Sequence, residues 1–185
     1  MATGFVVSST SESAEKEETD FMSRAFALAR EAFAANEVPV GCVITAEHQG
    51  KATVVGSGRN EVNATKNATR HAELVAIDRV SEFCLRHNLN TTDLLSHSTF
   101  YVNVEPCVMC ASALQQVRAV KVVFGCRNSR FGGMGTVLDV QAAVPGHRVL
   151  VEEAVRADEA VALLREFYKR ENPFAPKPLS KANRT

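Results

Sequence analysis

Near the N-terminus, apolar side chains recur every three or four residues and so mark one face of a helix. This face consists of Phe21, Ala25, Leu28, Ala29, Ala32 and Phe33. Asp20 stands immediately before it and has the side chain of an N-cap, while Pro39 cannot continue a helix. The pattern predicts an amphipathic helix from Asp20 to about residue 36.

Two apolar, β-rich runs follow, at 40–46 and 52–57, and the polar residues 47–51 separate them. Short apolar runs around a glycine-containing turn are typical of a β-hairpin. The next stretch, 59–70, is rich in Asn and Thr, and we predict that it forms a loop.

The rest of the chain alternates between helical and strand patterns. A helix is predicted from His71 to about residue 86, a strand at 99–104, a helix from Pro106 to about 117, a strand at 119–125, a strand near 148–152 and a helix from about 156 to 170. Pro106 suits the first turn of its helix, because that turn does not use the missing N–H. A glycine-rich loop is predicted at 132–135.

This order of elements predicts an α/β fold, with a three-layer α/β/α sandwich around a mixed five-stranded sheet. We assign residues 20–172 to this single domain. Residues 1–19 are rich in Ser, Thr and Glu and are predicted to be a disordered acidic tail. Residues 173–185 contain three prolines and are predicted to be an irregular basic tail.

Composition excludes several classes of protein. The 185 residues are 45% hydrophobic and 23% charged, which is ordinary for a globular domain and unlike a disordered or fibrous chain. No apolar run is long enough to cross a bilayer, so no membrane association is expected. The apolar cluster Phe5-Val6-Val7 is too short for a signal peptide, which predicts an intracellular protein of the nucleus and cytoplasm.

The formal net charge of zero conceals an uneven distribution. Residues 1–20 hold five acids and one base, whereas 165–185 hold six bases and two acids. Between residues 118 and 130 there are four bases and no acid. Such basic segments suit a polyanionic partner, although solvated surface charge would produce the same pattern.

Two separate motifs carry the candidate chemistry, namely His71-Ala72-Glu73 and Pro106-Cys107-Val108-Met109-Cys110. This combination, H-x-E followed by P-C-x-x-C, is the signature of zinc-dependent nucleobase deaminases. One imidazole and two thiolates give zinc three protein ligands and leave a fourth position for water, as catalytic sites require. We therefore predict that His71, Cys107 and Cys110 bind zinc and that Glu73 is the catalytic acid–base.

The predicted geometry places both motifs at helix N-termini. Cys107 and Cys110 would share one face of a first turn, where free N–H groups favour thiolates. His71 and Glu73 can both reach one ion only if they open their helix, so we predict two helix N-termini converging on it.

The cysteines alone would also fit a structural zinc knuckle or a redox C-x-x-C. A structural knuckle needs a fourth protein ligand at suitable spacing, and the isolated Cys42, Cys84 and Cys126 lie in apolar contexts typical of packing residues. The histidines outside the motif have no matching spacing and are assigned to surface or core. They are His48, His87, His97 and His147.

Four segments resemble the tRNA adenosine deaminases, which are members of the cytidine and deoxycytidylate deaminase superfamily. They are Asn36-Glu-Val-Pro-Val-Gly41, Arg59-Asn-Glu61, Asn67-Ala-Thr-Arg-His-Ala-Glu73 and Val104-Glu-Pro-Cys-Val-Met-Cys-Ala111. The resemblance runs from about residue 20 to 175. Residues 58–71, 130–133 and 167–173 further resemble the catalytic subunits of the eukaryotic enzymes that act on wobble adenosine 34.

This resemblance implies a hydrolase that converts adenosine 34 of tRNA to inosine, with one Zn²⁺ per chain. It implies a heterodimer with a homologous, catalytically inactive subunit that lacks the acid, and Glu73 marks this chain as the active partner. Asn60 would hydrogen-bond the flipped nucleoside, Val38 would pack on the base, and the Ala72 N–H would contact the base. Turn formation by Asn60 and core packing by Val38 are the alternatives.

The resemblance also implies weaker candidates for RNA contact. Phe167, Tyr168, Lys169 and Arg170 match the closing helix that borders the anticodon loop, where aromatic and basic side chains suit splayed nucleotides. Arg127, Asn128 and Arg130 follow the fourth predicted strand. Core packing of Phe167 is the competing interpretation.

Two other functions and one other assembly are also compatible with the sequence. A deaminase of free guanine, cytosine or deoxycytidylate could use the same zinc ligands, but the 59–70 loop and the basic tail favour a larger substrate. The chain could also act as a homodimer, as bacterial tRNA adenosine deaminases do. A non-catalytic, zinc-stabilised RNA-binding subunit would not need Glu73.

Overall fold

A five-stranded mixed sheet forms the centre of the molecule in the computed structural model, which describes residues 9–170. Its strands are β1 (Gly41–His48), β2 (Lys51–Arg59), β3 (Thr99–Val104), β4 (Lys121–Cys126) and β5 (Leu150–Glu152), in the spatial order β2-β1-β3-β4-β5. β1 runs antiparallel to β2 and β3, while β3, β4 and β5 are parallel. The predicted mixed five-stranded sheet is confirmed.

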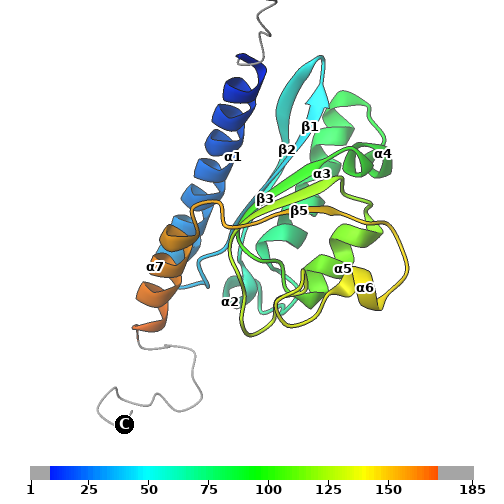
Figure 1. Cartoon of the computed structure of the whole chain (residues 1–185). Coiled ribbons are helices and arrows are strands. Elements are labelled where there is room, and N and C mark those ends of the chain that lie inside the picture. The colour runs from blue at the N-terminus through cyan, green and yellow to red at the C-terminus, as the bar shows by residue number, and fades with distance from the viewer. Residues whose placement is uncertain (1–8, 171–185) are drawn as a thin grey trace, which may run out of the picture.

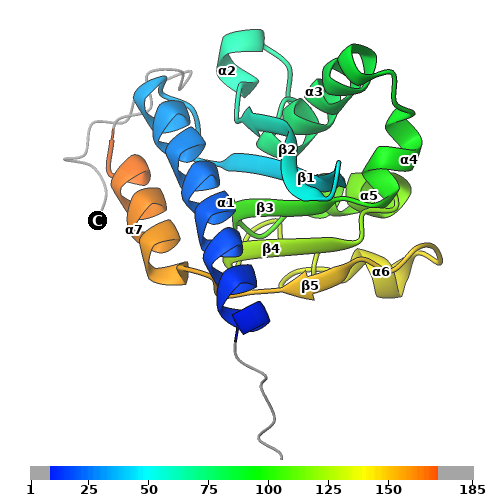
Figure 2. The same cartoon turned by 90° about the horizontal axis from the view of Figure 1, so that it is seen from above.

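Helices cover both faces of this sheet (Figures 1 and 2). α1 (Ser9–Ala34) and α7 (Ala157–Tyr168) lie side by side on one face, and α3 (Ala72–His87) and α5 (Val108–Gln116) lie on the other. Each face has its own buried core: Phe26 of α1 with Val123 on one, and Ala76 of α3 with Phe100 on the other. The three-layer sandwich is therefore confirmed.

The predicted start of the first helix is wrong. α1 begins at Ser9, so Asp20 is not its N-cap, and residues 9–19 of the predicted disordered tail are helical. The run from Ser11 to Glu18 is polar, which favours disorder, but its Glu, Ala and Lys residues are good helix formers. Residues 1–8 and the predicted tail at 173–185 lie outside the described residues.

The predicted hairpin is confirmed, and its turn is tight. Gln49 and Gly50, between β1 and β2, both have positive φ angles, of 53° and 74°. Two successive left-handed residues form the turn type whose twist matches that of the paired strands.

Three short helices were not predicted: α2 (Val62–Thr65), α4 (Thr91–Ser96) and α6 (Val140–Ala143). The expected start of α5 also shifts, because Cys107 is its N-cap and Pro106 lies before the helix. Among the described residues, no helix is long and apolar enough to span a membrane.

Candidate metal and catalytic site

The three predicted metal ligands come together between the N-termini of α3 and α5. His71 is the N-cap of α3, Cys107 is the N-cap of α5, and Cys110 lies in the first turn of α5. His71 Nδ1 is 3.5 Å from Cys107 Sγ and 3.6 Å from Cys110 Sγ. The prediction that two helix N-termini converge is confirmed.

These distances fit a tetrahedral zinc ion. Zinc–sulfur and zinc–nitrogen bonds of about 2.3 and 2.1 Å at tetrahedral angles separate the two ligand atoms by about 3.6 Å. All three ligand atoms lie within 4.8 Å of one another, and this is the one such group of three or more metal-ligating residues among the described residues. The side chains are thus arranged for zinc by geometry as well as by type.

The two thiols of the cluster differ in acidity. A hydrogen bond from Cys110, together with one from His71, lowers the pKa of the Cys107 thiol to about 4. The same Cys107–Cys110 hydrogen bond, together with burial, raises the pKa of Cys110. Two adjacent thiolates repel each other, and a bound dication supplies the positive charge that lets both stay deprotonated.

Glu73 lies beside this cluster but is not one of its ligands. It occupies the first turn of α3 and is 3% exposed. Burial raises the pKa of the Glu73 carboxyl, and the negative charge of Cys107 raises it further. A buried carboxyl whose pKa is shifted towards neutrality suits a group that accepts and returns protons.

Close packing of β2 on α3 fixes the first motif in place. A Cβ atom at Gly58 would lie 2.5 Å from the carbonyl oxygen of Ala72, so glycine is needed for this approach. The Glu61 N–H donates to the carbonyl of Arg70 at 3.0 Å and closes the 61–70 loop beside His71. Asn60 directly follows β2 and adjoins Glu61 at the base of this closed loop.

The predicted substrate-binding residues are all buried or half-buried. Asn60 is buried, and its side-chain Nδ2 donates to Glu37 Oε2 at 3.1 Å. Val38 is half-buried, and Ala72 is buried at the first position of α3. An N–H at that helical position has no partner within the helix and can meet a ligand.

Sequence reasoning missed three buried polar residues next to the motifs. Glu105 accepts hydrogen bonds from the N–H groups of Asn128, Met134 and Thr136, at 2.8, 3.0 and 3.2 Å. Asn103 binds the Gly41 N–H and the Pro39 carbonyl, both at 2.9 Å. Glu37 accepts from Ala64 and Asn60. Their positions beside Pro106 and Val38 were the available signal, but their burial depends on tertiary structure.

The first group of RNA candidates has partners within the protein. Arg127 forms a two-fold hydrogen-bonded ion pair with Glu153, at 2.9 and 2.7 Å. Asn128 Oδ1 accepts from the N–H groups of Arg130 and Phe131, so it shapes the loop. Arg130 is exposed, and its guanidinium lies over the Phe131 ring.

The second group lies on and after α7, beside α1 (Figure 2). Phe167 packs edge-on against Phe33 of α1, and Arg170 covers the same ring and donates to the Phe33 carbonyl. Tyr168 and Lys169 are exposed. Packing therefore accounts for Phe167 and Arg170.

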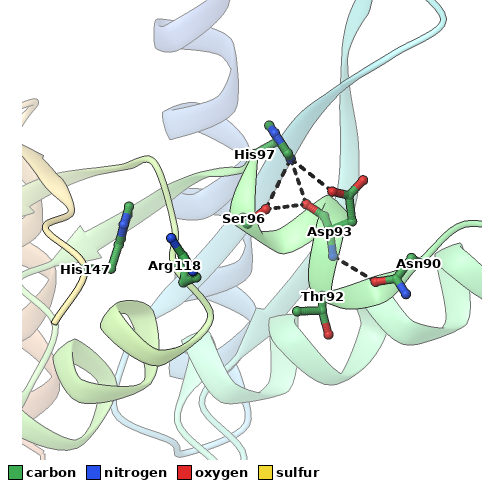
Figure 3. A pocket seen from close by; sticks show the side chains of 7 residues that line it. All are labelled: Asn90, Thr92, Asp93, Ser96, His97, Arg118 and His147. Carbon is green, nitrogen blue, oxygen red and sulfur yellow. Dashed lines mark hydrogen bonds and ion pairs between the residues drawn. The ribbon is translucent and has the colours of Figure 1, made fainter.

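A pocket elsewhere on the molecule contains none of the metal ligands (Figure 3). Its lining comes from α4, from Arg118 in the segment that joins α5 to β4, and from His147 in the segment that joins α6 to β5. Several of its polar groups bond within the protein: Ser96 donates to Asp93, and His147 Nε2 contacts the Ala119 carbonyl. We assign no role to it.

Comparison with known proteins agrees with this site. The model of the cytidine and deoxycytidylate deaminase zinc-binding region matches residues 15–126. The tRNA-specific adenosine deaminase 2 of Danio rerio is 46% identical over 167 residues, which are 89% of this chain and 76% of the relative. That of Xenopus tropicalis is 48% identical over 161 residues, or 85% of this chain and 92% of the relative.

Solved structures give the same fold. One from a study of A-to-I editing by tRNA:A34 deaminases at the wobble position has a TM-score of 0.67 and 26% identity, and the match covers 79% of this chain and 99% of that one. A guanine deaminase from Nitrosomonas europaea has a TM-score of 0.64 and 21% identity over 82% of this chain and 85% of its own, a likeness of fold alone.

Proposed function

We propose that this chain, which belongs to the cytidine and deoxycytidylate deaminase zinc-binding family, hydrolyses adenosine 34 of tRNA to inosine. Its similarity to two tRNA-specific adenosine deaminases 2, at 46% and 48% identity over 89% and 85% of its length, supports this proposal. The observation that carries this proposal is the cluster of His71, Cys107 and Cys110 with the buried Glu73 beside it. The reaction replaces the 6-amino group of adenine by oxygen from water and releases ammonia.

Zinc would be held by His71, Cys107 and Cys110. When bound, it lowers the pKa of a coordinated water to about 7, which makes a nucleophile available at neutral pH.

Glu73 carries the protons of the reaction. Its buried carboxylate accepts a proton from the attacking water and delivers it to adenine N1. It then takes the proton of the hydroxyl newly bound to C6 and gives it to the departing amine, which leaves as ammonia. Its side chain is 3% exposed, so a proton that it carries is shielded from bulk solvent.

Asn60, Val38 and Ala72 bind the flipped nucleoside. Asn60 offers an amide, Val38 an apolar side chain for the base face, and Ala72 the free N–H at the start of α3. Tyr168 and Lys169 are exposed members of the α7 group and contact RNA outside the site.

The active species is a heterodimer with a homologous, catalytically inactive subunit. The charge distribution supports this, because residues 21–164 have equal numbers of acidic and basic residues. A neutral body attracts a polyanion weakly, so a second chain must supply most of the RNA-binding surface.

Ammonia release from a panel of substrates tests this function. The complex purified with its native partner is offered a tRNA transcript with A34, the same transcript with G34, free adenosine, guanine, cytosine and deoxycytidylate. We expect turnover of the A34 transcript alone. Turnover of a free base or nucleotide in preference to it would replace the proposal with a small-molecule deaminase, and no turnover of any substrate would favour a non-catalytic subunit.

A further inference from the structure

Glu37 is a carboxylate with no exposed surface, and it lies in the short connection between α1 and β1. Both of its oxygens accept hydrogen bonds from the 60–64 segment. Oε1 accepts from the Ala64 N–H at 2.8 Å, and Oε2 accepts from Asn60 Nδ2 at 3.1 Å. A buried carboxylate is costly unless its oxygens are satisfied, so these contacts tie the two segments together.

This contact decides which way the Asn60 amide faces. A carboxylate accepts hydrogen bonds and does not donate them, so the nitrogen of the amide must point to Glu37 and the oxygen must point away. Within the described part of the chain, Asn60 Oδ1 accepts no hydrogen bond. It is nevertheless not among the fully buried side-chain atoms that lack a partner, so it must be partly exposed. The residue is 5% exposed, so this oxygen belongs to the small part that reaches solvent.

Glu37 is itself held firmly from both sides. Its N–H donates to the Ala32 carbonyl at 2.9 Å, which anchors it to the end of α1. Two residues later, Asn103 Nδ2 donates to the Pro39 carbonyl at 2.9 Å. Because the backbone at Glu37 is fixed, its carboxylate can hold the Asn60 amide in one orientation.

We propose that Glu37 is a positioning residue, which holds the Asn60 amide with its oxygen and its second N–H turned towards the flipped nucleoside. This inference rests on the proposed function, because it takes Asn60 as a nucleoside contact. Glu37 itself does not touch the substrate, and it acts through Asn60.

A double-mutant cycle separates this role from a structural one. Glu37→Gln keeps the shape of the side chain but replaces one accepting oxygen by an NH₂ group, which cannot accept from Asn60 or Ala64. We expect E37Q and Asn60→Ala each to lower kcat/KM on A34 tRNA by about 10- to 100-fold, because each removes a buried polar contact. The double variant should be no worse than N60A alone, and zinc content should stay at one per chain.

Glu105→Gln is the matched control, since Glu105 is also a buried carboxylate that accepts from N–H groups, but the structure records no contact between it and Asn60. Its effect on kcat/KM should multiply with that of N60A. Multiplicative effects of E37Q and N60A, or an unchanged E37Q, would overturn the proposal.

Two further readouts keep the outcomes distinct. If N60A deaminates A34 tRNA at the wild-type rate, the inference fails while the proposed function stands, whereas an inactive wild-type complex means that the proposed function fails. Should E37Q not fold, side-chain amide exchange in the wild-type protein still decides the matter. One Asn60 Nδ2 proton is expected to exchange slowly, and rapid exchange of both would contradict the proposal.

Discussion

Cys107 is one of the three predicted zinc ligands, so removing its sulfur tests the ligand assignment directly. In Cys107→Ala, zinc loses one of three ligands and the link between α3 and α5, so we expect less than stoichiometric metal and poorer folding. Elemental analysis of the purified protein measures this. Cys84→Ala is the control, because Cys84 is also a free thiol but lies in the last turn of α3, at the end opposite to the ligands. Full zinc occupancy in C107A would contradict the ligand assignment.

Glu73 is a proton carrier and not a ligand, so its loss should affect chemistry alone. We expect Glu73→Ala to fold, to keep one zinc and to bind tRNA, while its turnover falls by about 10²- to 10⁴-fold, the usual contribution of general acid–base catalysis. Single-turnover deamination and tRNA binding are measured on the same preparation. Turnover within tenfold of the wild-type value would remove Glu73 from the mechanism.

At this scale, the sequence predicted the residues whose spacing reflects chemistry. His71, Glu73, Cys107 and Cys110 stand in short motifs, so their types and intervals are visible without a fold. Glu105 stands beside one of those motifs and Glu37 stands beside Val38, but their partners are 23 to 31 residues away along the chain. Only the folded chain shows that they are buried and what they hold.

At the scale of elements, Glu105 joins the end of β3 to the loop at 128–136. That loop also contacts the start of α5, because the Val108 N–H donates to the Phe131 carbonyl and Gly133 donates to Pro106. We expect Glu105→Gln to lower the free energy of unfolding by about 1–3 kcal/mol, the cost of leaving buried N–H groups unsatisfied. Denaturant unfolding of the zinc-loaded protein measures this.

Gln115→Glu provides a comparison for E105Q. Gln115 is also a buried polar residue, but its side chain donates to the Val144 carbonyl, outside the 128–136 loop. Only E105Q should also increase the rate at which a chelator removes zinc. Unchanged stability and unchanged zinc loss in E105Q would mean that the loop holds its shape without Glu105.

Element types were predictable where periodicity was strong, and boundaries were not. The strands β1 to β4 and the helices α3, α5 and α7 follow their apolar patterns closely. The start of α1 was missed because helix propensity, and not apolar spacing, extends it to Ser9. The helices α2, α4 and α6 have four to six residues, which is too short for a recurring apolar face.

On the scale of the whole molecule, affinity for tRNA is predicted to depend on the basic C-terminal segment and on the partner. Deleting residues 173–185 removes Lys177, Lys181 and Arg184, while residues that bind zinc are retained. Binding should weaken, and the slope of log affinity against log salt should become shallower by about one unit or less per lost phosphate contact. Filter binding at several salt concentrations measures both.

The same titration with and without the native partner tests the heterodimer. A control truncation that removes 1–8 takes away no charged residue and should leave the salt slope unchanged. If the isolated full-length chain binds and deaminates tRNA as well as the complex, a homodimer becomes the better description.

The most direct test of the proposed function is the position of inosine in the product. Full-length tRNA with A34 is incubated with the purified zinc-loaded complex and then sequenced. Every adenosine that has become inosine is read as guanosine. We expect conversion at position 34 alone, and far less of it with the Glu73→Ala complex in the same time. Inosine at other positions in preference to 34, or equal conversion by the Glu73→Ala complex, would contradict the proposed function.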